Sequence, residues 1–164
     1  EKNGHRRIAV LLSEPHNDII MTRVKAVCDY AELRGMEAEV IDCQVTSGEV
    51  AAEKAYREFA AALRRQFKFS AVIGISGESF QGAVNACHNL RVKIPDDLSM
   101  ITIGAESLTD TFYPPITTVA VDFAAQVRSA LELLDHQIPG IPSICVKKLQ
   151  RPYVIERGSV NNIK

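Results

Sequence analysis

The sequence predicts an α/β fold in which a doubly wound, mostly parallel sheet carries helices on both faces. Short continuous apolar runs alternate along the chain with longer segments whose apolar residues recur every three or four positions. Continuous apolar runs are typical of parallel strands that are buried on both faces. Strands that alternate with helices favour right-handed crossover connections, and these produce a parallel sheet.

Five apolar runs are expected to form the strands of this sheet. They occupy residues 7–13, 36–42, 70–76, 98–103 and 117–121. A Pro-Asp-Asp turn at residues 95–97 precedes the fourth run, and Gly104 follows it, so both of its ends are marked. Two further β-like stretches are expected at residues 144–146 and 153–155.

The first two connecting segments have the spacing of amphipathic helices. In the first, Gly35 is placed for a left-handed C-terminal cap, and the apolar face consists of Ile20, Val24, Val27 and Ala31. In the second, Thr46 and Glu49 fit a capping box. The stripe of this second helix, which is expected to reach about Gln66, consists of Ala51, Ala55, Phe59 and Ala62.

Two more helices are expected further along the chain. Ser76 is a plausible N-cap for a helix that ends near Leu90 and whose apolar face consists of Phe80, Val84 and Cys87. Asp122 can cap a last helix over residues 123–138, which Pro139 ends. The stripe of this last helix consists of Val127, Leu131, Leu134 and Ile138.

Composition excludes several classes of function. The 19 basic and 20 acidic residues, with a pI of about 6.5, give no broad basic surface for nucleic-acid phosphates. No apolar run reaches the roughly 18 residues that cross a bilayer, and no signal-peptide pattern opens the chain, so a soluble, cytoplasmic protein is expected. The four cysteines are far apart with no Cys-x-x-Cys pair, which favours buried reduced thiols over disulfides or zinc.

Small polar residues follow several strands and should share the carboxyl edge of the sheet, where open α/β sheets bind ligands. They are Ser13, Glu14, His16 and Asn17 after the first strand, Ser76, Gly77 and Glu78 after the third, and Glu106 and Ser107 after the fourth. Arg23 projects nearby from the first helix. Such a group suits hydrogen bonding to a polyol or another polar metabolite. The alternative is that these residues are only caps and solvated loop residues.

Catalysis and metal binding have little support in the sequence. His88 and His136 have no partners at metal-ligand spacing, and His5 is expected to have a structural role. Neither a Gly-x-Ser-x-Gly elbow nor a Gly-rich phosphate loop is present. We therefore expect no cofactor, no metal and no enzymatic activity. A small flavodoxin-like or isomerase-like enzyme that uses Glu14, His16 or Glu106 as acid or base remains the alternative.

Five motifs occur in the order and approximate spacing of the LacI/GalR transcriptional regulators. They are residues 4–9 (Gly-His-Arg-Arg-Ile-Ala), the helix-opening Arg23, residues 94–104 from Ile-Pro-Asp-Asp to Ile-Gly, residues 114–119 (Pro-Pro-Ile-Thr-Thr-Val) and residues 157–160 (Arg-Gly-Ser-Val). Nearly the whole chain resembles the second half of their effector-binding region, which has the fold of type I periplasmic binding proteins. We therefore expect one lobe of a two-lobed clamp over residues 1–160, followed by a loose tail at 161–164.

The resemblance implies a small-molecule effector, such as a sugar or sugar-like molecule, bound between two lobes. Arg23 matches the arginine that reaches the effector in this family, and Glu106 stands where the family usually has an aspartate. Ser76 and Gly77 replace the family's Asn-Asp pair, and Val50 falls where some members place a stacking aromatic, so the pocket must differ. Ser13, Glu14 and His16 are candidate ligand residues by loop position alone.

The resemblance also implies partners. A homodimer is expected, with DNA bound only through a headpiece that this chain does not contain. The expected dimer contacts are Phe80, Val84, Cys87, Phe112 and Tyr113. The helix over residues 123–138 is expected to pack on the missing lobe or on a partner. A solute receptor of the periplasmic type is the alternative within the same fold.

Overall fold

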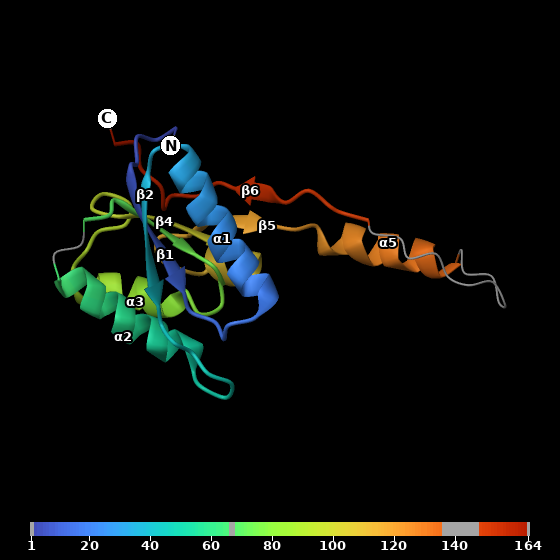
Figure 1. Ribbon diagram of the computed structural model, residues 1–164, viewed down its shortest axis with the longest axis horizontal. Coiled ribbons are helices and arrows are strands. Elements are labelled where there is room, and N and C mark those ends of the chain that lie inside the picture. The colour runs from blue at the N-terminus through green and yellow to red at the C-terminus, as the bar shows by residue number, and fades with distance from the viewer. Residues whose placement is uncertain (1, 66–67, 136–147, 164) are drawn as a thin grey trace.

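The computed structural model describes residues 2–65, 68–135 and 148–163, and these residues form a six-stranded sheet flanked by helices (Figure 1). The strand order is β2-β1-β3-β4-β5-β6, and only the last pair, β5 with β6, is antiparallel. The predicted fold class is confirmed.

The helices and strands follow the predicted order, with one additional short helix after the fourth strand. The strands are β1 (Arg7–Leu12), β2 (Glu37–Asp42), β3 (Ala71–Gly74), β4 (Ser99–Ile103), β5 (Thr117–Ala120) and β6 (Tyr153–Ile155). The helices are α1 (Asp18–Leu33), α2 (Ala51–Arg64), α3 (Gln81–Asn89), α4 (Glu106–Asp110) and α5 (Phe123–Asp135). The β-like stretch predicted at 144–146 and the end of the last predicted helix at 136–138 lie outside the described residues.

The two faces of the sheet are covered unequally. On one face α2 and α3 pack against the strands (Figure 1). Phe59, Phe80 and Met100 are completely buried on this side. On the other face α1 packs through Ile20 and Val24 and covers the strands only in part. The larger share of the apolar core therefore lies between the sheet and α2 with α3.

Polar side chains define the ends of α1. The Oδ1 atom of Asn17 accepts hydrogen bonds from the backbone N–H groups of Ile19 and Ile20, both at 3.0 Å, and so caps the first turn. At the other end Gly35 has a φ of +62°, and the N–H of Met36 donates to the carbonyl of Ala31 at 2.8 Å. Gly35 thus ends the helix in the predicted left-handed conformation.

Two predicted helix starts are wrong. Glu49 does accept hydrogen bonds from the N–H and hydroxyl of Thr46, but this contact closes a turn, and α2 begins only at Ala51. Ser76 does not cap α3, which begins five residues later at Gln81. The reason is a hydrogen bond of 2.9 Å from the N–H of Gly77 to the carbonyl of Ile103, which holds the chain after β3 against the end of β4.

The C-terminal segment is hydrogen-bonded to the sheet and to the N-terminal segment. After β6, the hydroxyl of Ser159 donates to the Met100 carbonyl at 2.6 Å and accepts from the Thr117 N–H at 2.8 Å. The segment expected to be a loose tail is tied down as far as Ile163, whose N–H donates to the Asn3 carbonyl at 2.8 Å. Both chain ends therefore lie side by side, as Figure 1 shows.

His5 secures this junction of the two ends. Its Nδ1 lies 2.8 Å from the hydroxyl of Ser70, and its Nε2 lies 3.2 Å from the carbonyl of Asn161. The side chain is buried, and this burial lowers the pKa of the imidazole below its ordinary value. The role is structural, as the sequence predicted.

Helix α5 extends away from the sheet (Figure 1). Asp122 caps it as predicted, because its Oδ1 accepts from the N–H of Ala125 at 2.8 Å. The exposed fractions of its stripe are 58% for Val127, 56% for Leu131 and 60% for Leu134. A soluble helix usually buries such a stripe, so this face of α5 is left uncovered by the described residues.

Candidate functional site

The carboxyl ends of β3 and β4 lie side by side, and several predicted site residues follow them in the chain. The guanidinium of Arg23 donates to the carbonyl of Ile75 at 3.2 Å, immediately before Ser76. Gly77 bonds in turn to the end of β4, two residues before Ala105 and three before Glu106. Arg23, Ser76 and Glu106 therefore lie along one edge of the sheet, as the topology predicts.

Gly77 makes the close approach between the two strand ends possible. A Cβ atom at this position would lie 2.5 Å from the carbonyl oxygen of Gly104 and 2.7 Å from the Cβ of Ala105. Both distances are shorter than real Cβ contacts, and the nearer atom belongs to the backbone. Glycine is therefore required here for steric reasons.

Glu106 opens α4, a five-residue helix that the sequence did not predict. The half-buried Glu106 side chain is within reach of β6, since the hydroxyl of Tyr153 lies 3.4 Å from its Oε2 atom. Asp122, at the end of β5, also contributes negative charge near this phenol. Partial burial and the charge of Glu106 raise the pKa of Tyr153 above its ordinary value.

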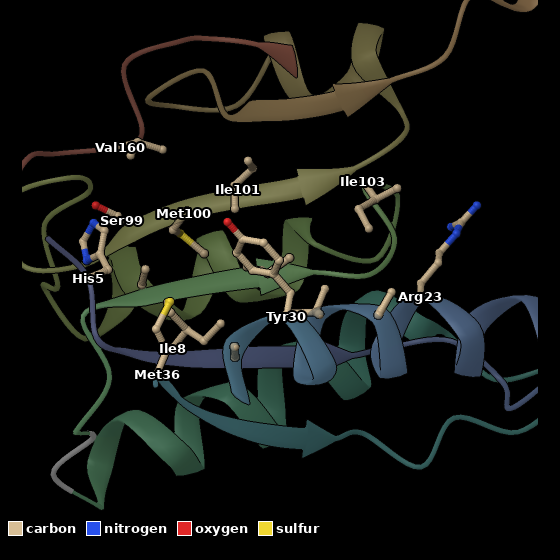
Figure 2. A pocket seen from close by; sticks show the side chains of 15 residues that line it. His5, Ile8, Arg23, Tyr30, Met36, Ser99, Met100, Ile101, Ile103 and Val160 are labelled. Carbon is tan, nitrogen blue, oxygen red and sulfur yellow. The ribbon is translucent and has the colours of Figure 1, made fainter. Parts of the chain in front are cut away.

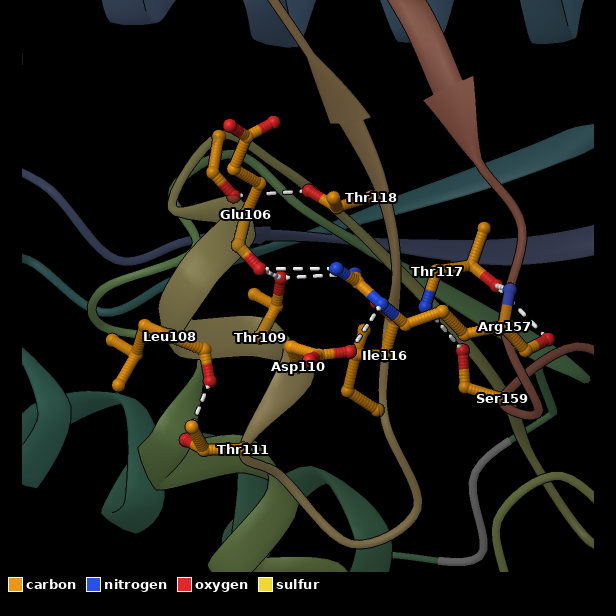
Figure 3. A network of polar contacts seen from close by, with 11 residues as sticks. Glu106, Leu108, Thr109, Asp110, Thr111, Ile116, Thr117, Thr118, Arg157 and Ser159 are labelled. Carbon is orange, nitrogen blue, oxygen red and sulfur yellow. Dashed lines mark hydrogen bonds and ion pairs between the residues drawn. The ribbon is translucent and has the colours of Figure 1, made fainter.

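Arg157 holds α4 against the sheet (Figure 3). One of its terminal nitrogens donates to the Ile116 carbonyl at 2.6 Å and to the hydroxyl of Thr109 at 3.2 Å. The other donates to the Glu106 carbonyl at 3.0 Å, and Nε pairs with Asp110 at 3.0 Å. Only 12% of the Arg157 side chain is exposed, so these acceptors take the place of the water that would otherwise hydrate the guanidinium.

The residues that follow β1 are not drawn into this group of contacts. Ser13 is fully buried, and its hydroxyl lies 2.6 Å from that of Ser79. His16 pairs through Nε2 with Asp42 at 3.1 Å, at the end of β2, which is three strands away from β4. Glu14 is half-buried and has no contact with Arg23 or Glu106 among those the structure records.

Four of the five residues expected at a dimer interface belong to the core of the lobe itself. Phe80, Val84, Cys87 and Phe112 are at most 4% exposed, so their side chains are not available to a partner. The resemblance suggested these residues, but Phe80, Val84 and Cys87 also form the apolar stripe of this segment, and such a stripe faces the core. Tyr113 is 82% exposed. It borders a hollow of about 540 Å³ together with His88, Arg91, Lys93 and Asp96.

A second hollow, of about 560 Å³, lies between α1 and the uncovered part of β3 and β4 (Figure 2). Its floor consists mainly of apolar side chains, including Ile73, Ile101 and Ile103. His5 lies at one end of this groove and Arg23 at the other, near the carboxyl ends of the strands (Figure 2). A lining with so few donors and acceptors does not suit a polar metabolite, which the strand edge suits better.

The described residues contain no group of three or more His, Cys, Asp or Glu side chains that could hold a metal ion. Cys28, Cys43 and Cys87 are free thiols, and Cys145 lies outside the described residues. Burial raises the pKa of Cys43 and Cys87 to about 12, so both stay protonated at neutral pH. Within the part of the chain that the structure describes, no helix could span a bilayer.

Sequence reasoning missed Tyr153 and Arg157 as neighbours of Glu106. Tyr153 was expected only as part of a β-like stretch, and Arg157 only as part of a motif. Contacts 47 and 51 residues apart in the chain leave no periodic signal. The antiparallel pairing of β6 with β5, which brings both residues back to Glu106, could not be predicted from the local pattern.

Comparison with known proteins agrees with this fold. The chain is 24% identical over 157 residues to the HTH-type transcriptional regulator MalR of Streptomyces coelicolor, covering 95% of this chain and 45% of MalR. A solved LacI family regulator from Enterococcus faecium, with bound ribose, superposes with a TM-score of 0.81 at 18% identity. One from Arthrobacter sp. FB24, in complex with lactose, gives 0.78 at 22% identity.

These matches cover nearly all of this chain but only part of each relative. The two structures match 99% and 96% of this chain but only 59% of their own chains, so this chain spans less than two thirds of its relatives. The sequence profile of the periplasmic binding protein-like domain matches residues 1–160. This match covers nearly the whole chain and agrees with the observed sheet order. The chain therefore belongs to the periplasmic binding protein-like domain family.

Proposed function

We propose that this chain is the effector-binding lobe of a LacI/GalR-like transcriptional regulator that senses a small polar metabolite, a sugar or sugar-like molecule. The observation that carries the proposal is the alignment of Arg23, Ser76 and Glu106 along one strand edge. A guanidinium that donates and a carboxylate that accepts, with a hydroxyl between them, match the vicinal hydroxyl groups of a sugar. Relatives with bound ribose and lactose support this ligand class.

The ligand residues of this proposal are Arg23, Ser76, Gly77 and Glu106. Gly77 contributes no side chain, and its N–H already donates to the Ile103 carbonyl, so its part in the site is to let the two strand ends approach each other. Glu106 is one methylene longer than the family's aspartate, which moves the acceptor further from β4. We therefore expect a sugar specificity different from that of relatives with the Asn-Asp pair.

The lobe acts with a second lobe and a second copy in this proposal. The uncovered stripe of α5 is the surface for the first lobe of the full regulator or for a partner. Tyr113 and the polar residues around it are the surface for a homodimer. DNA contact and a cytoplasmic location belong to the full regulator, and no catalysis is proposed for the lobe.

The test is a titration of the ¹⁵N-labelled chain with D-ribose and with lactose, followed by NMR. Binding should shift the Arg23 Nε–H signal and the amides of residues 76–77 and 106. Glu106→Gln and Arg23→Gln should each weaken binding at least tenfold, since each removes a charge-assisted hydrogen bond. Glu39→Gln, an exposed glutamate on β2, is the matched control and should bind as the parent does. Binding that neither site variant weakens would contradict the proposal.

A further inference from the structure

We propose that Tyr153 is a sugar-contacting residue of this site, with its ring as the apolar face on which the sugar packs and its hydroxyl beside the Glu106 carboxylate. The inference rests on the proposed function and extends it to a residue that the motifs do not mark. It concerns the specificity of the site.

The topology places Tyr153 at the same strand edge as the other site residues. Tyr153 is the first residue of β6, but β6 runs antiparallel to β5, so it pairs with Ala120 at the carboxyl end of β5. Neighbouring strands in the order β3-β4-β5-β6 therefore lead, at one edge, to Ser76, Glu106 and Tyr153.

The hydroxyl of Tyr153 has a weak partner, and part of the residue is exposed. Its hydroxyl lies 3.4 Å from Oε2 of Glu106, which is a long hydrogen bond that a sugar hydroxyl can replace at low cost. The residue is nevertheless 46% exposed. An exposed aromatic ring next to a carboxylate can bind both kinds of group on a sugar. The C–H groups pack on the ring, and the hydroxyl groups donate to the carboxylate.

Tyr153 gives the site an aromatic ring that Val50 does not. Val50, where some members of the family place a stacking aromatic, is a 65% exposed aliphatic residue at the start of α2. Tyr153 supplies the missing apolar face from a different strand. The protonated phenol remains a donor at neutral pH, since its pKa is raised by partial burial and by Glu106.

Arg157 fixes the geometry between the ring and the carboxylate. It lies four residues after Tyr153 and donates to the backbone carbonyl of Glu106 at 3.0 Å. It also bonds to the Ile116 carbonyl just before β5. The segment that carries Tyr153 and the helix that carries Glu106 are thereby joined to the same strand, and the pair is preorganised for a ligand.

The test uses the full chain with ¹³C-labelled tyrosine, and D-ribose and lactose as probes. Sugar should shift the ring signals of Tyr153 and leave those of Tyr113, which is exposed elsewhere, unchanged. Tyr153→Ser, which removes the ring, should weaken binding roughly tenfold. Tyr153→Phe, which keeps the ring, should stay within about threefold of the parent. Tyr113→Ser is the matched control and should leave binding unchanged.

The outcomes separate this inference from the proposed function. If the parent binds sugar and Glu106→Gln weakens it, but Tyr153→Ser binds equally well and the Tyr153 ring signals stay fixed, the inference is overturned and the proposed function stands. If the parent binds neither sugar, both are overturned. The ring signals of the parent decide the matter without any variant, so a Tyr153→Ser protein that failed to fold would not leave the inference open.

Discussion

The guanidinium of Arg157 donates to the backbone carbonyl of Glu106 at 3.0 Å, across 51 residues of sequence. This bond joins the segment after β6 to the first residue of α4. The short helix has no side-chain N-cap, so its position depends on contacts with the sheet. Arg157 is therefore central to both the stability of the lobe and the placement of its candidate ligand residue.

Replacing Arg157 by alanine should lower the free energy of unfolding by about 2 to 3 kcal/mol, because buried carbonyl and hydroxyl acceptors lose their donor. Arg157→Lys should recover only part of the lost free energy of unfolding. The single ammonium group of lysine cannot reach all the acceptors that the planar guanidinium contacts. Urea unfolding measures both. Arg7→Ala is the control, since Arg7 forms an exposed pair with Glu37 and its loss should cost less than about 0.5 kcal/mol. Equal losses for Arg157→Ala and Arg7→Ala would refute the assignment.

Gly77→Ala should destabilise the lobe by about 1 to 3 kcal/mol, because the added methyl group would meet the backbone of Gly104. Gly158→Ala is the matched control, since no atom lies within 4 Å of the position of its Cβ. This second change should be neutral or stabilise by up to about 1 kcal/mol. Thermal unfolding of the two variants compares them directly. A Gly77→Ala protein as stable as the parent would show that the strand ends do not approach so closely.

The uncovered stripe of α5 should make the isolated chain self-associate. Sedimentation velocity should show species larger than the monomer, and Leu131→Ser should reduce them while changing the free energy of unfolding by less than about 0.5 kcal/mol. Leu33→Ser, at a 79% exposed position on α1, is the control and should leave association unchanged. A strictly monomeric parent chain would speak against α5 as a docking surface.

His5 should make the stability of the lobe depend on pH in the acidic range. Its pKa in the folded state lies below the ordinary value of 6.5, so the unfolded chain binds the proton more readily. The stabilisation is complete above that value and decreases as the pH falls through it toward the folded-state pKa. Unfolding followed from pH 7.5 to 5 should show a slope that His5→Gln reduces. The same slope in parent and variant would exclude His5 as its source.

Long amphipathic helices could be predicted from the sequence, whereas short helices could not. The stripe from Ile20 to Ala31 and the glycine at position 35 defined α1 because many residues repeat one signal. The five residues of α4 are too few to show a period. Ser76 has the chemistry of an N-cap, but the bond from Gly77 to Ile103 delays the helix, and such a tertiary bond is invisible locally.

The candidate site was predictable where topology alone decides it. Parallel strands bring their carboxyl ends together, so Arg23, Ser76 and Glu106 were expected at one edge. Ser13 and His16 also follow a strand at this edge, but the side chain of Ser13 turns inward to Ser79 and that of His16 turns to Asp42. Loop position sets where a residue lies along the edge, whereas the direction of its side chain depends on the partners it finds.

The most direct measurement of the central claim is a crystal structure of this chain grown with D-ribose or lactose. Sugar density is expected at the strand edge, with hydroxyl groups within hydrogen-bond distance of Arg23 and Glu106. Sugar found only in the apolar groove between α1 and the sheet, with no contact to Glu106, would contradict it.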